Sequence, residues 1–286
     1  METVAVIGPV AIDRVVQDGV SVYKRGGVVT YAGLTYVELG IATSAVTNIA
    51  SADREILTLL RQRGIEVYAG DSLQTTHFVN YIAGDERRQE LLACATPIVA
   101  TQFEEVLNEV KHVHLGPLYP DDIALAAVAG IGAKCRVSLD IQGYVRRLAG
   151  KEVVPEVARE LLQVLRCADV VKASAEELQL VLAYCDRLLS QLMADCAITE
   201  WIVTDGSRGG WVVDQTGRQT DFAAHPITAV ADPTGAGDVF FAAYLVSRLH
   251  RGEDCGDATR FAAELAGRQV AGDFIDASSL RLDWRA

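Results

Sequence analysis

The chain has 286 residues, of which 50% are apolar and 22% are charged, and its formal net charge is −12. This composition excludes a disordered or fibrous protein and provides a core for one large α/β domain or two small ones. Because an acidic chain repels nucleic acid and anionic membranes, we expect neither as a partner. The six cysteines lack metal-ligand spacing, and neither a leader peptide nor a membrane-spanning run is visible, which favours a cytoplasmic protein.

The predicted elements alternate between strands and helices along the chain. The apolar run at 4–8 predicts a buried strand that ends in a glycine. Two more polar segments, 14–30 and 76–92, have the punctuation of β-ribbons and are expected to form a small β lid. Further strands are predicted at 44–49, 113–115, 137–139, 170–171, 201–204, 210–213 and 218–222, and helices at 52–63, 123–129, 157–165, 176–184, 237–249 and 257–270. This alternation predicts one α/β domain over residues 1–286, with a mostly parallel sheet between two layers of helices.

The segment 231–240, A-D-P-T-G-A-G-D-V-F, contains the residues most suited to chemistry. Gly235 and Gly237 permit tight turns and a close approach of the backbone to a ligand. The unpaired N–H groups of the helix that follows form an anion site, which could neutralise the charge on a transferring phosphoryl group. Asp238, in the first helical turn, could accept a proton from a substrate hydroxyl. The plainer alternative is an acidic residue favoured there by the helix dipole.

The longer string D-P-T-G-A-G-D-V-F-F, which begins at Asp232, resembles the C-terminal signature of the PfkB (ribokinase-like) family of carbohydrate kinases. The resemblance implies a three-layer ribokinase-like fold, with ATP and Mg²⁺ as cofactors. It also implies that Asp238 is the catalytic base. The anion hole and the adjoining ATP contact would then be formed by Gly235, Ala236, Gly237 and Thr234.

Two segments near the N-terminus resemble the part of the family pattern that binds the acceptor. Asp13 follows the first strand, where the family has an Asp that binds substrate hydroxyls. Gly26 and Gly27 match a glycine pair whose backbone touches the substrate, but Tyr31 stands where Asn is usual. Taken without the resemblance, Asp13 is a solubilising residue and the glycine pair is a hairpin turn.

Two segments in the middle of the chain continue the resemblance. Asp140 and Arg146 follow a predicted strand, where the family has D-x-N and a downstream Arg that contact the substrate. Ser174 and Glu177 match the K-x-N-x-x-E segment, whose Glu helps to hold Mg²⁺ through water, with Ser in place of Asn. The same two residues also form the pattern of a helix capping box, and the two interpretations are compatible.

The segment 203–210 resembles the T-x-G-x-x-G nucleotide segment, and it assigns ATP contacts to Thr204, Gly206 and Gly209. A glycine-rich turn between two strands is the alternative. Elsewhere, His112 and His114 would face one side of a strand, so a metal pair is conceivable. Without a visible third ligand, packing at a strand edge is the favoured interpretation.

Four motifs in family order favour an ATP-dependent kinase that phosphorylates a hydroxyl of a sugar or a cyclitol. Tyr31, Gln142-Gly143 and the K-x-S-x-E-E form loosely resemble the myo-inositol kinase branch. The alternatives are a nucleoside kinase and a non-catalytic relative that binds a nucleotide or metabolite. A Rossmann-type dehydrogenase is disfavoured because Gly8 does not begin a G-x-G-x-x-G pattern. Pairing of lid strands in a homodimer would cover their exposed edges.

Overall fold

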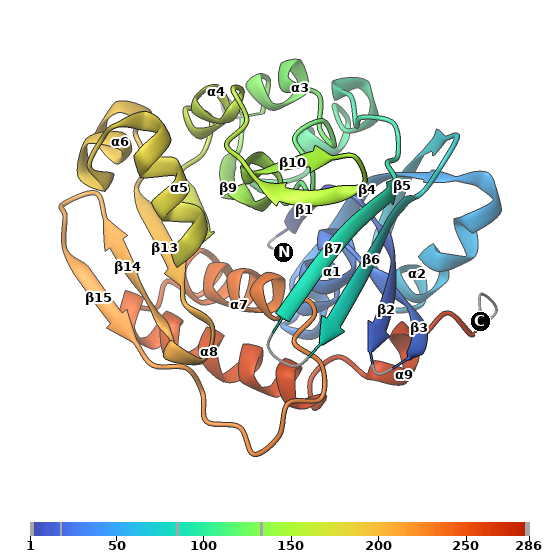
Figure 1. Ribbon diagram of the computed structural model, residues 1–286. Helices are drawn as coiled ribbons and strands as arrows, with labels where there is room; N and C mark the ends of the chain where they lie inside the picture. Colours follow the sequence, from blue (N-terminus) through green and yellow to red (C-terminus); the bar gives the residue numbers. More distant parts are fainter. Residues whose placement is uncertain (1–2, 18, 84–85, 132–133, 284–286) are drawn as a thin grey trace.

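A nine-stranded sheet forms the centre of the computed structural model, which describes residues 3–17, 19–83, 86–131 and 134–283 (Figure 1). Its strand order is β15-β14-β13-β12-β9-β8-β1-β4-β5, and all neighbours are parallel except at β13-β14 and β14-β15. The strands are β1 (Thr3–Ile7), β4 (Ala42–Ala50), β5 (Glu66–Ser72), β8 (His112–Leu115), β9 (Arg136–Asp140), β12 (Val170–Ser174), β13 (Glu200–Thr204), β14 (Gly210–Asp214) and β15 (Gln219–Phe222).

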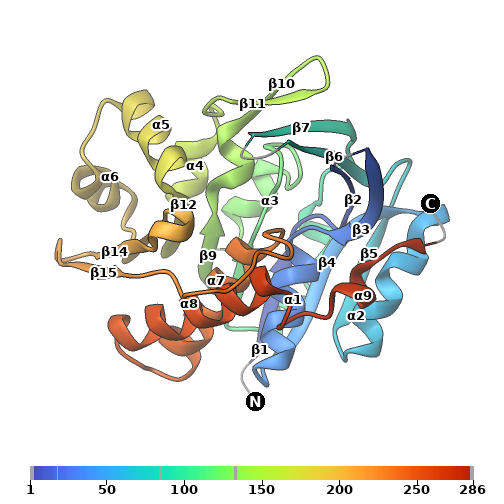
Figure 2. The same ribbon diagram turned by 60° about the horizontal axis from the view of Figure 1, so that its bottom comes forward.

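Helices cover both faces of this sheet (Figure 2). One face packs against α1 (Val28–Glu38), α7 (Ala236–Leu245) and α8 (Cys255–Ala271); the other packs against α3 (Leu125–Ala129), α4 (Leu161–Leu165), α5 (Ala175–Cys185) and α6 (Leu189–Cys196). Because successive side chains of a strand point to opposite faces, Val4 and Val6 enter the first core while Ala5 and Ile7 enter the second. The predicted three-layer α/β fold is confirmed.

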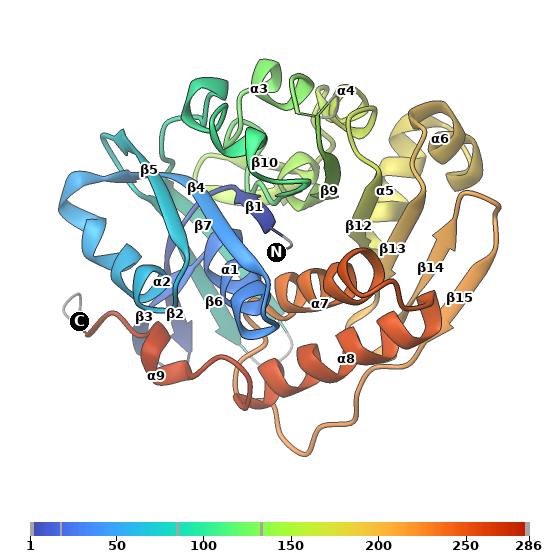
Figure 3. The ribbon, with the colours of Figure 1, turned by 180° about the vertical axis from the view of Figure 1, so that it is seen from behind.

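A second, six-stranded sheet lies beside the large one, in the order β10-β11-β7-β6-β2-β3. Its strands are β2 (Ala11–Gln17), β3 (Val20–Gly26), β6 (Thr76–Ala83), β7 (Glu86–Ala93), β10 (Arg146–Ala149) and β11 (Glu152–Pro155). Strands were thus expected correctly in most of 14–30 and 76–92, but residues 28–30 belong to α1. The pair β10-β11 was not predicted. The C-terminal helix α9 (Ala277–Leu280) lies beside β3, where Arg25 Nη1 donates to Ser279 O at 2.7 Å (Figure 3).

Gly26 ends β3 and Gly27 is the N-cap residue of α1, so the alternative of a simple hairpin turn is wrong. Gly27 has φ +87°, and a Cβ there would lie 2.1 Å from Pro9 O. A Cβ on Gly26 would lie 2.0 Å from Asp13 Oδ2, so only glycine leaves room for that carboxylate. Helix α1 was not predicted, because it is apolar and buried on nearly every side and therefore lacks an amphipathic pattern.

Several smaller elements complete the chain. A 3-10 segment (Ser51–Leu57) and α2 (Thr58–Gln62) occupy the helix predicted at 52–63, and a π-helical turn (Val246–His250) extends α7. Helix α6 was also not predicted. In the part of the chain that the structure describes, no helix is long and apolar enough to cross a membrane.

The two histidines of the H-x-H motif lie inside the large sheet, on β8 between β1 and β9, and not at a strand edge. His112 shares hydrogen bonds with His250 at 3.2 Å and with Ser138 Oγ at 2.8 Å, and His114 Nδ1 lies 3.0 Å from Tyr36 OH. No group of three metal-ligating side chains occurs among the described residues. Hydrogen bonds thus reach both ring nitrogens of His112, whereas the buried Nε2 of His114 has no partner among the described residues.

Candidate active site

A cavity of about 190 Å³ lies at the carboxyl end of the parallel strands, between the two sheets. Open α/β sheets bind ligands at this edge. Strands β9 and β12 and the first turns of α1 and α7 contribute to its walls, and β2, β6 and β7 of the small sheet contribute to its cover. The lining residues are Asp13, Gly27, Tyr31, Phe78, Asn80, Gln89, Leu118, Asp140, Gln142, Arg146, Lys172, Pro233, Thr234, Gly235, Gly237 and Asp238.

The first turn of α7 presents unpaired backbone donors to this cavity. Ala236 N–H donates to Pro233 O at 3.3 Å, and Val239 N–H donates to Gly235 O at 2.9 Å. Between them, the N–H groups of Gly237 and Asp238 have no acceptor among the described residues. With the helix dipole, these N–H groups are suited to an anion. Of the predicted anion hole, the Ala236 N–H group is instead bonded to Pro233 O.

The loop that leads into α7 is held from both sides. Asp232 forms an ion pair with Lys24 at 2.7 Å and accepts a hydrogen bond from Thr234 N at 3.0 Å. On the other side, the Tyr31 ring packs on Gly235, where a Cβ would lie 2.1 Å from the ring. Gly235 also has φ +76°, so both conformation and space require glycine. The loop geometry is therefore set before any ligand arrives.

Asp238 lies in the cavity with an uncommitted carboxylate. It is half-buried, and no hydrogen bond reaches it from any residue that the structure describes. The pKa of Asp238 is raised to about 7: desolvation contributes most and Asp140 adds to the rise, whereas Lys172 and Arg146 oppose it. A carboxylate with this pKa can take up a proton near neutral pH.

Asp140 and Lys172 form a buried ion pair beside Asp238. Lys172 Nζ lies 2.7 Å from Asp140 Oδ2, and both side chains are less than one-tenth exposed. Asp140 Oδ1 accepts from Gln142 N at 3.0 Å. Arg146, also in the cavity, donates to Leu118 O at 3.2 Å. The sequence analysis assigned Lys172 no role, although it lies in the K-A-S-A-E-E segment that resembles the family pattern.

The small sheet adds amide groups that the sequence analysis missed. Asn80 on β6 is the register partner of Gln89 on β7, and Gln89 Nε2 donates to Asn80 Oδ1 at 2.8 Å. With Asp13 on β2, they place polar atoms over the cavity. The available signal was their position on one face of the predicted hairpin at 76–92.

Tyr31 lies between the loop of α7 and Asp13. Its ring is buried, and its hydroxyl finds no hydrogen-bond partner within the described residues. Burial raises the pKa of Tyr31, and the nearby carboxylates of Asp13, Asp232 and Asp238 raise it further. The phenol therefore stays protonated and can donate a hydrogen bond to a ligand that enters the cavity.

Ser174 and Glu177 form the predicted capping box at the start of α5. Glu177 N donates to Ser174 Oγ at 3.1 Å, and Ser174 N donates to Glu177 Oε2 at 2.7 Å. Both residues line an adjoining cavity of about 760 Å³, which shares Gln89 and Arg146 with the first. Burial raises the pKa of Glu177, with Asp140 adding to the shift and Lys172 opposing it.

Thr204, Gly206 and Gly209 lie at the same edge of the sheet but do not line the 190 Å³ cavity. Thr204 ends β13, and the two glycines bound the turn to β14. A Cβ on Gly209, which has φ +90°, would lie 2.1 Å from Phe222 O. The requirement for glycine at 209 is thus explained by the close passage of another segment.

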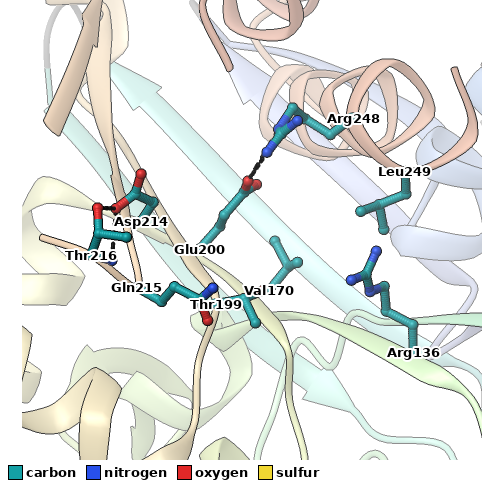
Figure 4. Close-up of a pocket in the computed structure, with 9 residues that line it drawn as sticks. All are labelled: Arg136, Val170, Thr199, Glu200, Asp214, Gln215, Thr216, Arg248 and Leu249. Carbon is teal, nitrogen blue, oxygen red and sulfur yellow. Dashed lines mark hydrogen bonds and ion pairs between the residues drawn. The ribbon is translucent and has the colours of Figure 1, made fainter. Parts of the chain in front are cut away.

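A cavity of about 380 Å³, larger than the one beside Asp238, lies at the opposite edge of the sheet (Figure 4). Glu200 and Arg248 form an ion pair there, and Glu200 also accepts a hydrogen bond from Tyr244 OH at 2.6 Å. Burial raises the pKa of Tyr244, and the pKa of Arg248 is raised as well, because its pairing with Glu200 outweighs burial. None of the motif residues lies in this cavity, so its size does not make it the catalytic site.

A three-layer fold with an acidic residue at a helix start that leaves backbone N–H groups open is the arrangement of an α/β kinase. The chain matches the family model for the pfkB family carbohydrate kinases over residues 2–272 and belongs to that family. It is 25% identical to a cytidine kinase of Thermococcus kodakarensis, over 93% of this chain and 95% of the relative.

Solved structures share the fold at lower identity. A pyrophosphate-dependent kinase of the ribokinase family, complexed with a pyrophosphate analog and myo-inositol, superposes with a TM-score of 0.82 at 24% identity, over 94% of this chain and 95% of that one. Arabidopsis thaliana ribokinase, complexed with ribose and ATP, superposes with a TM-score of 0.74 at 19% identity, over 98% and 95% of the two chains.

Proposed function

We propose that this kinase transfers the terminal phosphoryl group of ATP to a hydroxyl of a neutral sugar or cyclitol, with Asp238 as the general base. The observation that carries the proposal is the Asp238 carboxylate beside the N–H groups of Gly237 and Asp238, none of which has a hydrogen-bond partner among the described residues. A proton acceptor and an anion cradle thus meet in one small cavity. Phosphoryl transfer needs this combination of positioning and charge stabilisation.

The walls of the cavity suit a compact acceptor with several hydroxyl groups. Asp13 offers a carboxylate, Asn80 and Gln89 offer amides, and Tyr31 offers an unpartnered hydroxyl. Hydroxyl groups both donate and accept hydrogen bonds, so a polyol can pair with all of these groups. Gly27, whose backbone lies in the same wall, allows the acceptor to approach closely. Myo-inositol is therefore the first acceptor to test.

A nucleotide donor is supported by the surface next to the predicted ATP segment. The chain between β15 and α7 runs along α8, where Ala231 N donates to Val270 O at 2.8 Å. Ile227 and Val230 on this segment are exposed, and a purine base could pack on such apolar side chains. The ATP phosphates would then reach from Thr204, Gly206 and Gly209 to Thr234 and the first turn of α7. Pyrophosphate, the donor of a structural relative, is the competing donor.

Mg²⁺ would be held through water at Glu177, whose Oε2 serves the capping box while Oε1 accepts no hydrogen bond from any described residue. The bound cation would neutralise charge on the donor phosphates. Closure of β2, β3, β6 and β7 as a lid would exclude water and suppress hydrolysis of the donor.

A nucleoside is the second candidate acceptor. The adjoining 760 Å³ cavity shares Gln89 and Arg146 with the first, and the guanidinium of Arg88 lies over the Tyr81 ring there at 4.2 Å. A base attached to a ribose in the first cavity could extend into this space. The relative named a cytidine kinase is consistent with this candidate.

A crossed panel tests both donor and acceptor. Myo-inositol, ribose, fructose and cytidine would each be incubated with ATP or pyrophosphate and Mg²⁺, and the products identified by phosphorus NMR. We expect ATP with a neutral polyol to give the highest kcat/KM. If no pair exceeds the rate of donor hydrolysis without acceptor, the proposed function is wrong.

A further inference from the structure

A further cavity, of about 450 Å³, shares none of its described lining residues with the 190 Å³ cavity of the candidate active site. The segments at 94–97 and 119–125 contribute to its walls, together with Tyr144 and Glu160. Half of its lining residues are alanine, proline, isoleucine or leucine. A cavity of this volume with largely apolar walls suits a small organic molecule.

The charged part of this lining is acidic. It consists of Asp121, Asp122 and Glu160, and the described lining residues include no lysine, arginine or histidine. Glu160 pairs with the exposed Arg159 at 2.5 Å, whereas Asp121 and Asp122 form no ion pair with any residue that the structure describes. These carboxylates are not gathered around one point, because no group of three metal-ligating side chains occurs among the described residues. The cavity therefore carries negative charge that a metal ion does not fit.

Asp122 is the buried carboxylate of this lining, with only 6% of the residue exposed. Its Oδ2 accepts hydrogen bonds from Leu118 N at 2.7 Å and from Tyr119 N at 2.9 Å, while Oδ1 accepts none from the described residues. The pKa of Asp122 is raised to about 6: desolvation contributes most, and the two backbone N–H groups oppose the rise. Burying a carboxylate without a cation beside it is costly, so a cation that enters the cavity gains a fixed partner.

Tyr144 adds a buried hydroxyl group to the same cavity. The residue is 1% exposed, and its hydroxyl forms no hydrogen bond with any described residue. Burial raises the pKa of Tyr144, and the three carboxylates of the lining add to the rise, so the phenol lies close to them. A phenol oxygen can accept a hydrogen bond from an ammonium group that is bound at Asp122.

We propose that this cavity binds a small organic ammonium ion, with the charged group at Asp122 and Tyr144 and the apolar body against Ile123 and Leu125. Such a ligand supplies the cation that the walls lack, and it covers their apolar surface. A metal ion would leave that surface uncovered, and a neutral molecule would leave Asp122 without a counter-charge. This site goes beyond the proposed kinase activity, and binding to it does not depend on that activity.

One loop connects the ammonium site to the candidate active site. Leu118, whose N–H group is held by Asp122, also lines the 190 Å³ cavity. The Leu118 carbonyl oxygen accepts a hydrogen bond from Arg146 Nη1 at 3.2 Å, and Arg146 lines the same cavity. An ammonium ion at Asp122 draws on the carboxylate that fixes Leu118, so its binding should loosen this contact and weaken binding of the acceptor.

Benzylamine is a suitable probe, because it joins an ammonium group to one apolar ring, and benzyl alcohol is its neutral match. Calorimetry at about pH 7.5, where Asp122 is ionised, would measure the affinity of both. We expect benzylamine to bind at least about tenfold tighter than benzyl alcohol, the gain from a charge-assisted hydrogen bond. Equal affinities, or no binding of benzylamine, would overturn the proposal.

Two variants show where the probe binds. Asp122→Asn keeps an oxygen for the Leu118 and Tyr119 N–H groups and removes the charge, so the affinity for benzylamine should fall at least about tenfold while that for benzyl alcohol is unchanged. Asp169→Asn is the matched control, because that carboxylate holds Val137 N at 2.7 Å at the opposite edge of the sheet, and benzylamine should bind it as it binds the wild type. Unchanged affinity in Asp122→Asn would place benzylamine elsewhere and refute the site.

Acceptor titrations with and without saturating benzylamine test the connection to the active site, which rests on the proposed function. We expect the acceptor KM to rise about fivefold in the wild type, at the lower end of couplings between sites, and to stay constant in Asp122→Asn. A constant KM in the wild type would refute the connection. Because calorimetry needs no turnover, a lack of kinase activity would refute the proposed function and leave the ammonium site supported by its binding data.

Discussion

Two charged clusters lie at opposite edges of the same sheet, and they differ in what is left unpaired. At the edge shown in Figure 4, Glu200 accepts from Tyr244 OH and from Arg248 Nε, at 2.6 and 3.1 Å. Arg248 in turn donates to Glu253 O at 2.7 Å. At the carboxyl edge, by contrast, Asp238 accepts no hydrogen bond from the described residues. The Tyr31 hydroxyl there is also without a partner in the described structure.

This difference distinguishes the candidate site from a structural cluster better than cavity volume does. The cavity at the structural cluster holds about 380 Å³, twice the volume of the one beside Asp238. Buried polar groups normally find partners within the protein, because leaving them unpaired is costly. Groups that remain open at the carboxyl ends of parallel strands therefore point to partners supplied by a ligand.

Exchanging one carboxylate for an amide at each edge should give the largest contrast. We expect Asp238→Asn to lower kcat about 10²- to 10⁴-fold through loss of the general base, with the fold intact. Glu200→Gln should instead lower the free energy of unfolding by about 1–3 kcal/mol, because it weakens charged hydrogen bonds. Its kcat, measured on folded protein, should stay near that of the wild type. A near-normal kcat for Asp238→Asn would show that Asp238 is not the base.

The pH dependence of kcat/KM should give the second-largest contrast between the two clusters. A base must be deprotonated to act, and burial raises the pKa of Asp238 to about 7, with Asp140 adding to the rise and Lys172 and Arg146 opposing it. The kcat/KM should therefore rise through pH 7 to a plateau and lie about a hundredfold below that plateau at pH 5. Arg248 stays charged and Tyr244 stays neutral over this range, because the pKa of each is raised. A flat profile between pH 5 and 8 would contradict this assignment.

The two tyrosines should give the smallest contrast. Tyr31→Phe removes an unpartnered hydroxyl, so stability should not fall, while the acceptor KM should rise about three- to tenfold through loss of one hydrogen bond. Tyr244→Phe removes a hydroxyl bound to Glu200, so stability should fall by about 1–2 kcal/mol with KM unchanged. Thermal unfolding and acceptor titrations on both variants would measure these changes. An unchanged KM in Tyr31→Phe would exclude contact with the acceptor.

Much of the fold could be predicted because parallel strands in the centre of a sheet are short apolar runs. The strands at 4–8, 113–115 and 137–139 were found in this way. Helix α1 was not predicted because it is buried on nearly every side, so its sequence has no polar face to mark the period of a helix. The pair β10-β11 was not predicted because its residues are half-exposed or exposed and because β11 pairs with β7, which is distant in sequence.

Only the part of the candidate site that is contiguous in sequence could be predicted. Asp238 and its glycines are contiguous, so their chemistry follows from one helix start. Lys172 lies 66 positions away from Asp238 in sequence. Only the pairing of β9 with β12 and the packing of α7 bring its ammonium group to Asp140 and Gly237.

The sequence by itself determined the alternation of elements, the glycine-rich start of α7 and the identity of its acidic residue, because these are local properties of the chain. Tertiary structure alone decided which distant groups share the cavity and which stay unpaired. Burial and neighbouring charges also decided the pKa of Asp238, since desolvation depends on everything packed around a carboxylate and not on its neighbours in sequence.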